Sequence, residues 1–98
     1  MIYVVNAVGT SDKKCPYGYS SWLDFWQKRT QKIAAFCRNC GKSTTNLVGG
    51  HVQKVEKSLN GKWYRVDGLY IIPICPDCNN PENNTIFHVD ETELVKVS

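Results

Sequence analysis

The sequence predicts a small α+β domain built around a metal site, and three features of the chain carry this prediction. Four cysteines form two identical Cys-x-x-Cys pairs, Cys37–Cys40 and Cys75–Cys78. Between the pairs, two runs of strand-forming residues flank the dipeptide Asn60-Gly61, a pattern typical of a β-hairpin. Ahead of the pairs, aromatic residues recur at helical spacing. A chain of 98 residues with 42% hydrophobic residues is sized for one domain, so we expect residues 1–98 to fold together.

The N-terminal segment is expected to be a strand followed by a loop. Residues Ile2 to Val8 are rich in β-branched side chains, whereas residues 9–19 contain Gly, Ser, Asp and Pro. The apolar stretch stops at Asn6 and has no basic flank, so it is too short for a signal peptide or a membrane span. We therefore expect a cytoplasmic protein that makes no membrane contact.

A helix is expected to follow this loop. Ser20 or Ser21 offers an N-cap, and Asp24 lies at the spacing of a capping box. One face of the helix carries Trp22, Phe25, Trp26 and Arg29. We expect this Trp-rich amphipathic helix to bury its aromatic side chains in the core. The alternative is a platform on which bases stack.

The two cysteine pairs are expected in different local structures. A short strand, Ile33 to Phe36, leads into the first pair, and Gly41 directly after Cys40 suits the tight turn of a zinc knuckle. The second pair follows the apolar run Tyr70 to Ile74, and Pro76 fits the first turn of a helix beginning near Cys75.

The remaining segments predict strands. Leu47 to Val55 and Trp63 to Ile74 are expected to form the hairpin, and Asp67-Gly68 is a second turn signal that would allow two short hairpins. The tail is expected to add strands at Ile86–Val89 and Leu94–Val97.

Two Cys-x-x-Cys pairs place four thiolates in the tetrahedral geometry that Zn²⁺ takes in structural sites. The 34 residues between Cys40 and Cys75 would form a long loop closed by the metal. We therefore predict one structural Zn²⁺ per chain, bound by Cys37, Cys40, Cys75 and Cys78. Short disulfides or buried free thiols are the alternative, which an odd total of five cysteines makes less favourable.

A knuckle, a hairpin and a cysteine pair at a helix start follow one another in the order of a treble clef, with its core at about 36–82. From Phe36 to about Asn80 the chain resembles the zinc-containing branch of the HNH endonuclease family. The matching elements are Cys37-x-x-Cys40, then Leu47-Val48-Gly49-Gly50-His51-Val52, then Ile74-Cys75-x-x-Cys78-Asn79.

The resemblance implies roles for two residues: His51 as general base on the attacking water, and Asn79 as a ligand of a catalytic Mg²⁺. It also exposes gaps in the motif. Gly50 stands where the family has an Asp or His ligand, Tyr70 lies near the expected orienting Asn, and Glu82 replaces a basic residue. Because a one-metal nuclease needs a firmly held cation, these gaps favour a domain without nuclease activity. An active HNH-type endonuclease is the second hypothesis.

Charge is divided unevenly along the chain, which has a net charge of +3. Residues 1–65 hold 11 Lys/Arg against 3 Asp/Glu, a net of +8, and residues 66–98 hold 1 against 6, a net of −5. A basic half attracts phosphates, so the leading hypothesis is a module that binds DNA or RNA. The candidate phosphate contacts are Arg38, Lys42, Lys54, Lys57, Lys62 and Arg65. The alternatives are a solvated basic surface and a protein–protein interaction module.

Cys15 is the fifth thiol and is expected to be half-buried and free. A second metal site with His88 or His51, or a catalytic Cys–His pair, is the alternative.

Overall fold

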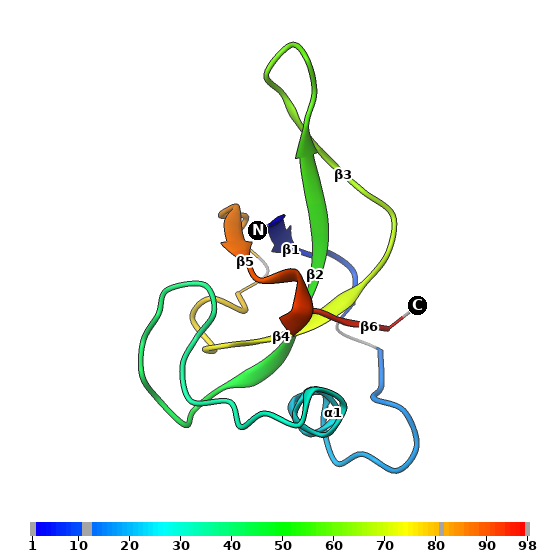
Figure 1. The fold of residues 1–98 in the computed structure, drawn as a ribbon, viewed down its shortest axis with the longest axis vertical. Coiled ribbons are helices and arrows are strands. Elements are labelled where there is room, and N and C mark those ends of the chain that lie inside the picture. Colours follow the sequence, from blue (N-terminus) through cyan, green and yellow to red (C-terminus); the bar gives the residue numbers. More distant parts are fainter. Residues whose placement is uncertain (1, 11–12, 81, 98) are drawn as a thin grey trace.

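The computed structural model describes residues 2–10, 13–80 and 82–97. One α-helix packs against a twisted antiparallel sheet, so the chain is a small mixed α/β fold (Figure 1). A long hairpin projects from the body and contributes to principal-axis extents of 43 × 28 × 25 Å (Figure 1).

Within the described residues, six strands form one sheet in which β2 is central. Their bounds are β1 (Ile2–Asn6), β2 (Val48–Lys57), β3 (Trp63–Arg65), β4 (Tyr70–Ile74), β5 (Phe87–Val89) and β6 (Val95–Lys96). The order is β5-β1-β2-β4-β6, and β3 also pairs with β2. The N-terminal strand and the two tail strands are present as expected, with slightly shorter bounds.

The second arm of the hairpin is interrupted rather than continuous. Arg65 pairs with Val55, and the next register pair on the same edge of β2 is Tyr70 with Val52. Four residues of this arm therefore oppose two of β2, and Gly68 takes a φ of +118° within the excursion. The Asp67-Gly68 signal thus marks an irregular excursion in one hairpin, and the possibility of two hairpins was wrong.

Helix α1 (Trp22–Thr30) begins at the predicted cap. Ser21 Oγ accepts a hydrogen bond from the Asp24 N–H at 3.0 Å, and the Asp24 carboxylate accepts one from the Ser20 N–H at 3.0 Å. The first bond is the N-cap bond of a capping box. The second resembles that of a capping box but is shifted by one residue, because its donor Ser20 precedes the N-cap. The prediction of the helix start is confirmed.

The aromatic face of α1 enters the core, as predicted. Phe25 and Trp26 are buried, and the Trp26 indole N–H donates to the Glu93 carbonyl at 2.6 Å. The helix packs closely on β2 at Gly49, where a Cβ would lie within 3 Å of the Trp22 backbone. A side chain at this position would push α1 off the sheet.

Two local predictions near the cysteines were wrong. Ile33 is exposed, and the segment before the first pair contributes only one bridge, Phe36 with Ser43, instead of a strand. Within the described residues, Cys75 to Asn80 form turns and no helix. The polar residues after Cys78 offer no apolar face that would pack a helix against the sheet.

The tail returns along the body of the domain. A short 3₁₀ helix, η1 (Glu91–Glu93), connects β5 and β6, and the Asp90 side chain accepts from the Thr92 N–H at its start. No helix in the described ranges has the length and apolar character required to cross a lipid bilayer.

Candidate metal centre and the adjoining cleft

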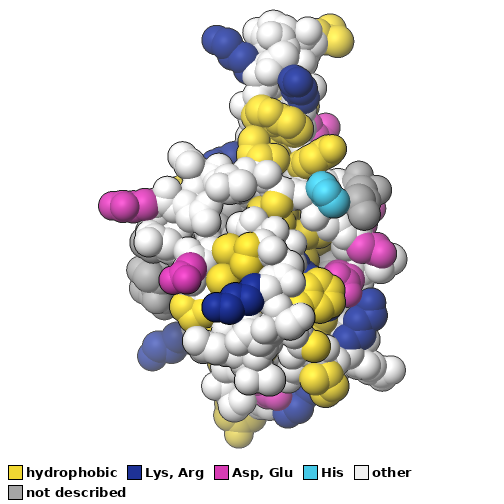
Figure 2. All heavy atoms as spheres, turned by 90° about the vertical axis from the view of Figure 1, so that its left-hand side faces the viewer, with side chains coloured by type: hydrophobic (Ala, Val, Ile, Leu, Met, Phe, Trp, Pro, Cys, Tyr) yellow, Lys and Arg dark blue, Asp and Glu magenta, His cyan; other side chains and the backbone are white. Residues whose placement is uncertain are grey.

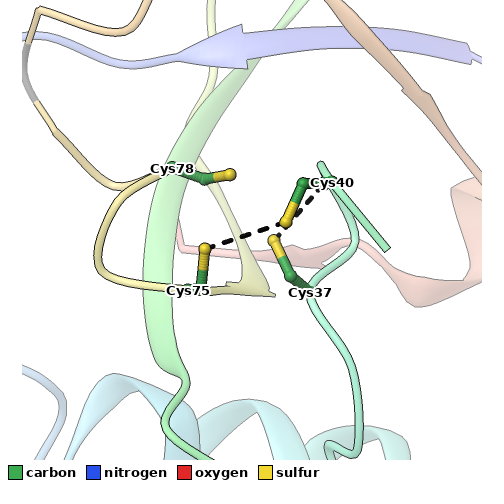
Figure 3. A group of neighbouring side chains, drawn as sticks. All are labelled: Cys37, Cys40, Cys75 and Cys78. Atoms are coloured by element: carbon green, nitrogen blue, oxygen red, sulfur yellow. Dashed lines mark hydrogen bonds between the residues drawn. The ribbon is translucent and has the colours of Figure 1, made fainter. Parts of the chain in front are cut away.

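Four cysteines converge at one end of the sheet. The Sγ atoms of Cys37, Cys40, Cys75 and Cys78 all lie within 4.8 Å of one another and point toward a common centre (Figure 3). Cys40 Sγ and Cys75 Sγ are 3.9 Å apart. Four thiolates at 2.3 Å from a tetrahedral metal ion would be about 3.8 Å apart. The four cysteines are therefore positioned to coordinate one metal ion, and all five cysteines are free of disulfides.

The first pair lies in a tight knuckle. The Cys37 N–H donates to the Lys42 carbonyl at 2.9 Å, and the Gly41 N–H donates back to the Cys37 carbonyl at 2.9 Å. Gly41 has a φ of +78°, the left-handed conformation that the Cys-x-x-Cys-Gly pattern predicts. The Arg38 N–H donates to the Pro73 carbonyl at 3.0 Å and so fastens the knuckle to β4.

The second pair lies on a turn directly after β4. The Asn79 N–H donates to the Cys75 carbonyl at 3.0 Å, which closes the turn. Asn6, at the end of β1, donates from Nδ2 to the Cys78 carbonyl at 2.7 Å and to the Asn83 carbonyl at 3.1 Å. Sequence reasoning missed this buried residue. Its signal is a single amide side chain at the end of an otherwise apolar strand.

The cysteines differ in acidity. Burial opposes ionisation of Cys37, but N–H groups of Cys40, Cys75 and Asn39 lower the pKa of its thiol to about 7. Two of these donors, Asn39 and Cys40, lie 3.4 Å from its sulfur. Burial and hydrogen bonds to the neighbouring thiols raise the pKa of Cys78. The Cys37 thiol is thus partly ionised near neutral pH, whereas a full set of four thiolates requires a bound cation.

A cleft of about 460 Å³ lies beside the metal centre. Its lining includes His51 and Asn79, the two residues that the HNH resemblance singles out. Asn6, Lys13 and Trp22 line it as well, and none of these three is among the site residues predicted from the sequence. His51 and Asn79 therefore border a cleft of mixed polar and apolar lining, and the His51 side chain itself is buried at its wall.

Gly50 is closed to any side chain. A Cβ built there would lie within 3 Å of the Ile74 side chain and 3.1 Å from Asn79 Oδ1. The position where the family holds a metal ligand is consequently occupied by core packing. The register partner of His51 is Ile71, an apolar residue, and Tyr70 pairs with Val52 instead. Neither residue orients the imidazole in the way that the family's Asn does.

His51 is held by an aromatic contact and has an unused ring nitrogen. Its ring meets Trp22 edge to face, with centroids 4.7 Å apart. The residue is 8% exposed, and its Nε2 has no hydrogen-bond partner within the described ranges. Burial, reinforced by the positive charge of Lys13, lowers the pKa of His51. The imidazole is thus neutral near pH 7, as a general base or an uncharged packing group would be.

The six predicted basic residues do not form one surface, and two of them pair with the acidic tail. Arg38 donates from Nε and Nη2 to the Glu93 carboxylate at 3.0 and 3.1 Å, and its side chain is 7% exposed. Lys54 pairs with Glu91 at 2.8 Å. Ion pairs between η1 and the N-terminal half therefore occupy two of the predicted phosphate contacts, Arg38 and Lys54.

The other predicted phosphate contacts differ in their surroundings. Arg65 donates from Nη1 to the Asn6 carbonyl at 2.9 Å and to Gln53 at 3.0 Å. Lys42, Lys57 and Lys62 are exposed and have no carboxylate partner among the described residues. Lys57 and Lys62 both lie near the tip of the projecting hairpin, whereas Lys42 belongs to the knuckle.

The remaining candidates lie apart from the metal centre. Cys15 is half-buried, as predicted, and its thiol donates to the Tyr19 carbonyl at 3.3 Å. His88 is exposed on β5 and contacts the Tyr3 ring. Neither belongs to the group of four cysteines.

Comparisons with known proteins leave the chain without an assigned family. No protein-family model, curated protein or solved structure gives a significant match to it.

Proposed function

We propose that the chain is a zinc-stabilised domain that binds nucleic acid through its projecting hairpin and has no nuclease activity of its own. The zinc assignment rests on the all-sulfur ligand set. Four sulfur ligands suit the soft, tetrahedral preference of Zn²⁺ and leave no open coordination position for catalysis. The metal would then be a structural element joining the knuckle to β4.

A treble-clef core of the HNH type remains part of this proposal. The hydrogen-bonded knuckle at Cys37–Cys40 and the hairpin between the two pairs support it. The turn at Cys75–Cys78 replaces the helix that the type usually has, so the proposal is of a shortened variant.

The observation that carries nucleic-acid binding is the chemistry of the hairpin. Lys57 and Lys62 flank its tip, and the Ser58 N–H between them donates to the Lys62 carbonyl at 2.8 Å. Lys/Arg side chains project from this part of the surface (Figure 2). A protruding arm with cations at its tip reaches the phosphates of a groove or a strand more readily than a flat surface does.

Salt-dependent binding tests the proposal. Removing two phosphate interactions with duplex DNA would reduce the slope of log affinity against log salt by about 1.8. We therefore expect the double substitution Lys57→Glu, Lys62→Glu to weaken binding and flatten the slope. The matched control is Lys14→Glu, Lys96→Glu, which changes net charge equally at two exposed lysines outside the hairpin. Equal weakening in both double variants, or no binding of the wild type at low salt, would contradict the proposal and favour a protein partner.

A second candidate function is hydrolysis in the cleft beside the metal centre. The observation that favours it is the shared cleft of His51 and Asn79. A neutral imidazole there has the protonation state of a general base. The closed position at Gly50 argues against it, since Asn79 alone is a weak ligand for Mg²⁺.

A further inference from the structure

Three ring side chains stand in a row on one face of the sheet. His88 of β5 and Tyr3 of β1 are register partners. Their ring centroids are 6.1 Å apart, and the angle between the ring planes is 82°. The centroid of the Tyr3 ring in turn lies 5.4 Å from that of the Trp63 ring of β3, and the two ring planes meet at 58°. The three rings come from strands that are far apart in sequence. Strand β2 lies between β1 and β3, and its residue opposite Tyr3 is Val55, whose small side chain leaves room for the Tyr3 and Trp63 rings to meet above it.

The large rings of this row remain exposed instead of entering the core. Tyr3 is 45% exposed and Trp63 is 41% exposed. Hydrophobic side chains gather at the base of the hairpin on the face shown in Figure 2. A hollow of about 780 Å³ runs beside Tyr3 and Trp63. Exposed aromatic side chains grouped around a hollow are characteristic of a binding surface.

Positive charge accompanies the rings. Lys57 is the register partner of Trp63, and its Nζ lies 5.8 Å from the centre of the Trp63 ring. The lining of the hollow also contains Lys54, which is paired with Glu91, and Glu56. The lysine charges of the hollow itself are therefore balanced, and the cations near the hairpin tip that lack a carboxylate partner in the described residues are Lys57, beside the Trp63 ring, and Lys62. Lys62 continues the charge toward the hairpin tip. Aromatic rings flanked by cations match a ligand with flat apolar faces and a negatively charged backbone.

We propose that Tyr3, Trp63 and His88 form a stacking platform for single-stranded nucleic acid. The proposal deepens the nucleic-acid-binding function and rests on it. The bases of a duplex are stacked inside the helix and present only their edges, so rings on a sheet face can stack only on unpaired bases. Lys57 and Lys62 would contact the phosphates of the strand whose bases lie on the platform.

Strand β3 also contains a control residue for the platform. Tyr64, next to Trp63, is 50% exposed. It pairs with Glu56, and its hydroxyl lies 3.5 Å from the Glu56 carboxylate on the opposite face of the strand. Tyr64→Ala therefore removes a similarly exposed ring from the same strand and leaves the rings of Tyr3, Trp63 and His88 in place.

The experiment measures the affinity of zinc-loaded protein for oligothymidine, oligouridine and a duplex of the same length. We expect both single strands to bind more tightly than the duplex, and a difference between the first two would separate DNA from RNA preference. Tyr3→Ala and Trp63→Ala should each weaken single-strand binding by about 5- to 140-fold, the ratio for one stacked base. Duplex binding should change little, and Tyr64→Ala should leave both unchanged.

Trp63→Phe gives a spectroscopic readout that does not depend on folding of the alanine variants. Trp26 is buried and Trp22 is half-buried, so a stacked base would quench mainly Trp63. The Phe variant should retain binding, measured by anisotropy of a labelled strand, and lose most of the quenching.

Any of the following three results would overturn the platform, as would the two outcomes given after them. The first is single-strand affinity no greater than duplex affinity, the second is equal weakening in Tyr64→Ala, and the third is full quenching in Trp63→Phe. If the ring variants bind normally while Lys57→Glu, Lys62→Glu binds poorly, the platform fails and the nucleic-acid function stands. If no nucleic acid binds at all, both fail.

Discussion

The guanidinium of Arg38 holds the carboxylate of Glu93 in a two-pronged ion pair, with Nε–Oε1 and Nη2–Oε2 distances of 3.0 and 3.1 Å. The same guanidinium lies 3.8 Å from the centre of the Phe36 ring, and the Glu93 carbonyl accepts from the Trp26 indole. This pair joins the metal knuckle, the helix and the C-terminal segment. Its burial indicates a stabilising role and makes Arg38 a poor candidate for a phosphate contact.

Replacing Arg38 should therefore affect stability more than nucleic-acid affinity. We expect Arg38→Ala to reduce the free energy of unfolding by about 1.5–3 kcal/mol, the range for a hydrogen-bonded charged group. Urea denaturation of zinc-loaded protein measures the reduction, with exposed Arg29→Ala as the control. A reduction below about 0.5 kcal/mol would show that the pair is screened like a surface salt bridge.

The four-cysteine centre predicts one zinc ion with only sulfur ligands. X-ray absorption should give four sulfur neighbours at about 2.3 Å, and elemental analysis should give close to one equivalent of zinc. Cys37→Ser or Cys75→Ser should unfold the domain, because structural zinc contributes roughly 10–16 kcal/mol. Cys15→Ser is the control and should keep both metal and fold. Nitrogen among the ligands, or a folded Cys75→Ser variant without metal, would refute the assignment.

The closed position at Gly50 predicts the absence of metal-dependent nicking. Supercoiled plasmid incubated with the protein and Mg²⁺, Mn²⁺ or Ni²⁺ should remain supercoiled. Gly50→Asp, which introduces the ligand type of the HNH endonucleases that the sequence resembles, should destabilise the fold instead of creating activity, since its Cβ would collide with Ile74. Nicking by the wild type that disappears in His51→Ala would establish the hydrolytic function.

The environment of His51 predicts that the pKa of its imidazole is lower than usual. Burial, and after it the charge of Lys13, lowers the pKa of this imidazole below its usual 6.5. Protonation then favours the unfolded chain, so the contribution of His51 to stability is lost as the pH falls below about 6.5. NMR of the imidazole protons should show a neutral ring at pH 7, and Lys13→Gln should raise the pKa partway. A pKa at or above 6.5 would show that the cleft is more hydrated than its geometry indicates.

Local signals in the sequence were sufficient for several features. The N-cap at Ser21, the aromatic face of α1, the glycine of the knuckle and the Asn60-Gly61 hairpin were all predicted, because each depends on residues close together in the chain. The convergence of the four cysteines was predicted as well, since a shared tetrahedral site is the simplest reason for their repeated spacing.

Other features depend on contacts between residues that are distant in the sequence, and only the tertiary structure decided them. The turn at Cys75–Cys78 in place of a helix, the ion pair of Arg38 with Glu93, and the closed position at Gly50 all depend on which strands lie beside which. The row formed by His88, Tyr3 and Trp63 requires β5, β1 and β3 to meet across β2. The sequence by itself determined which four cysteines are positioned to coordinate one metal ion, and it determined the local caps and turns. Only packing of the sheet decided which basic residues lack a carboxylate partner in the described residues and which aromatic rings remain exposed. The reason is that contacts between distant segments bury or pair a side chain independently of its neighbours in the chain.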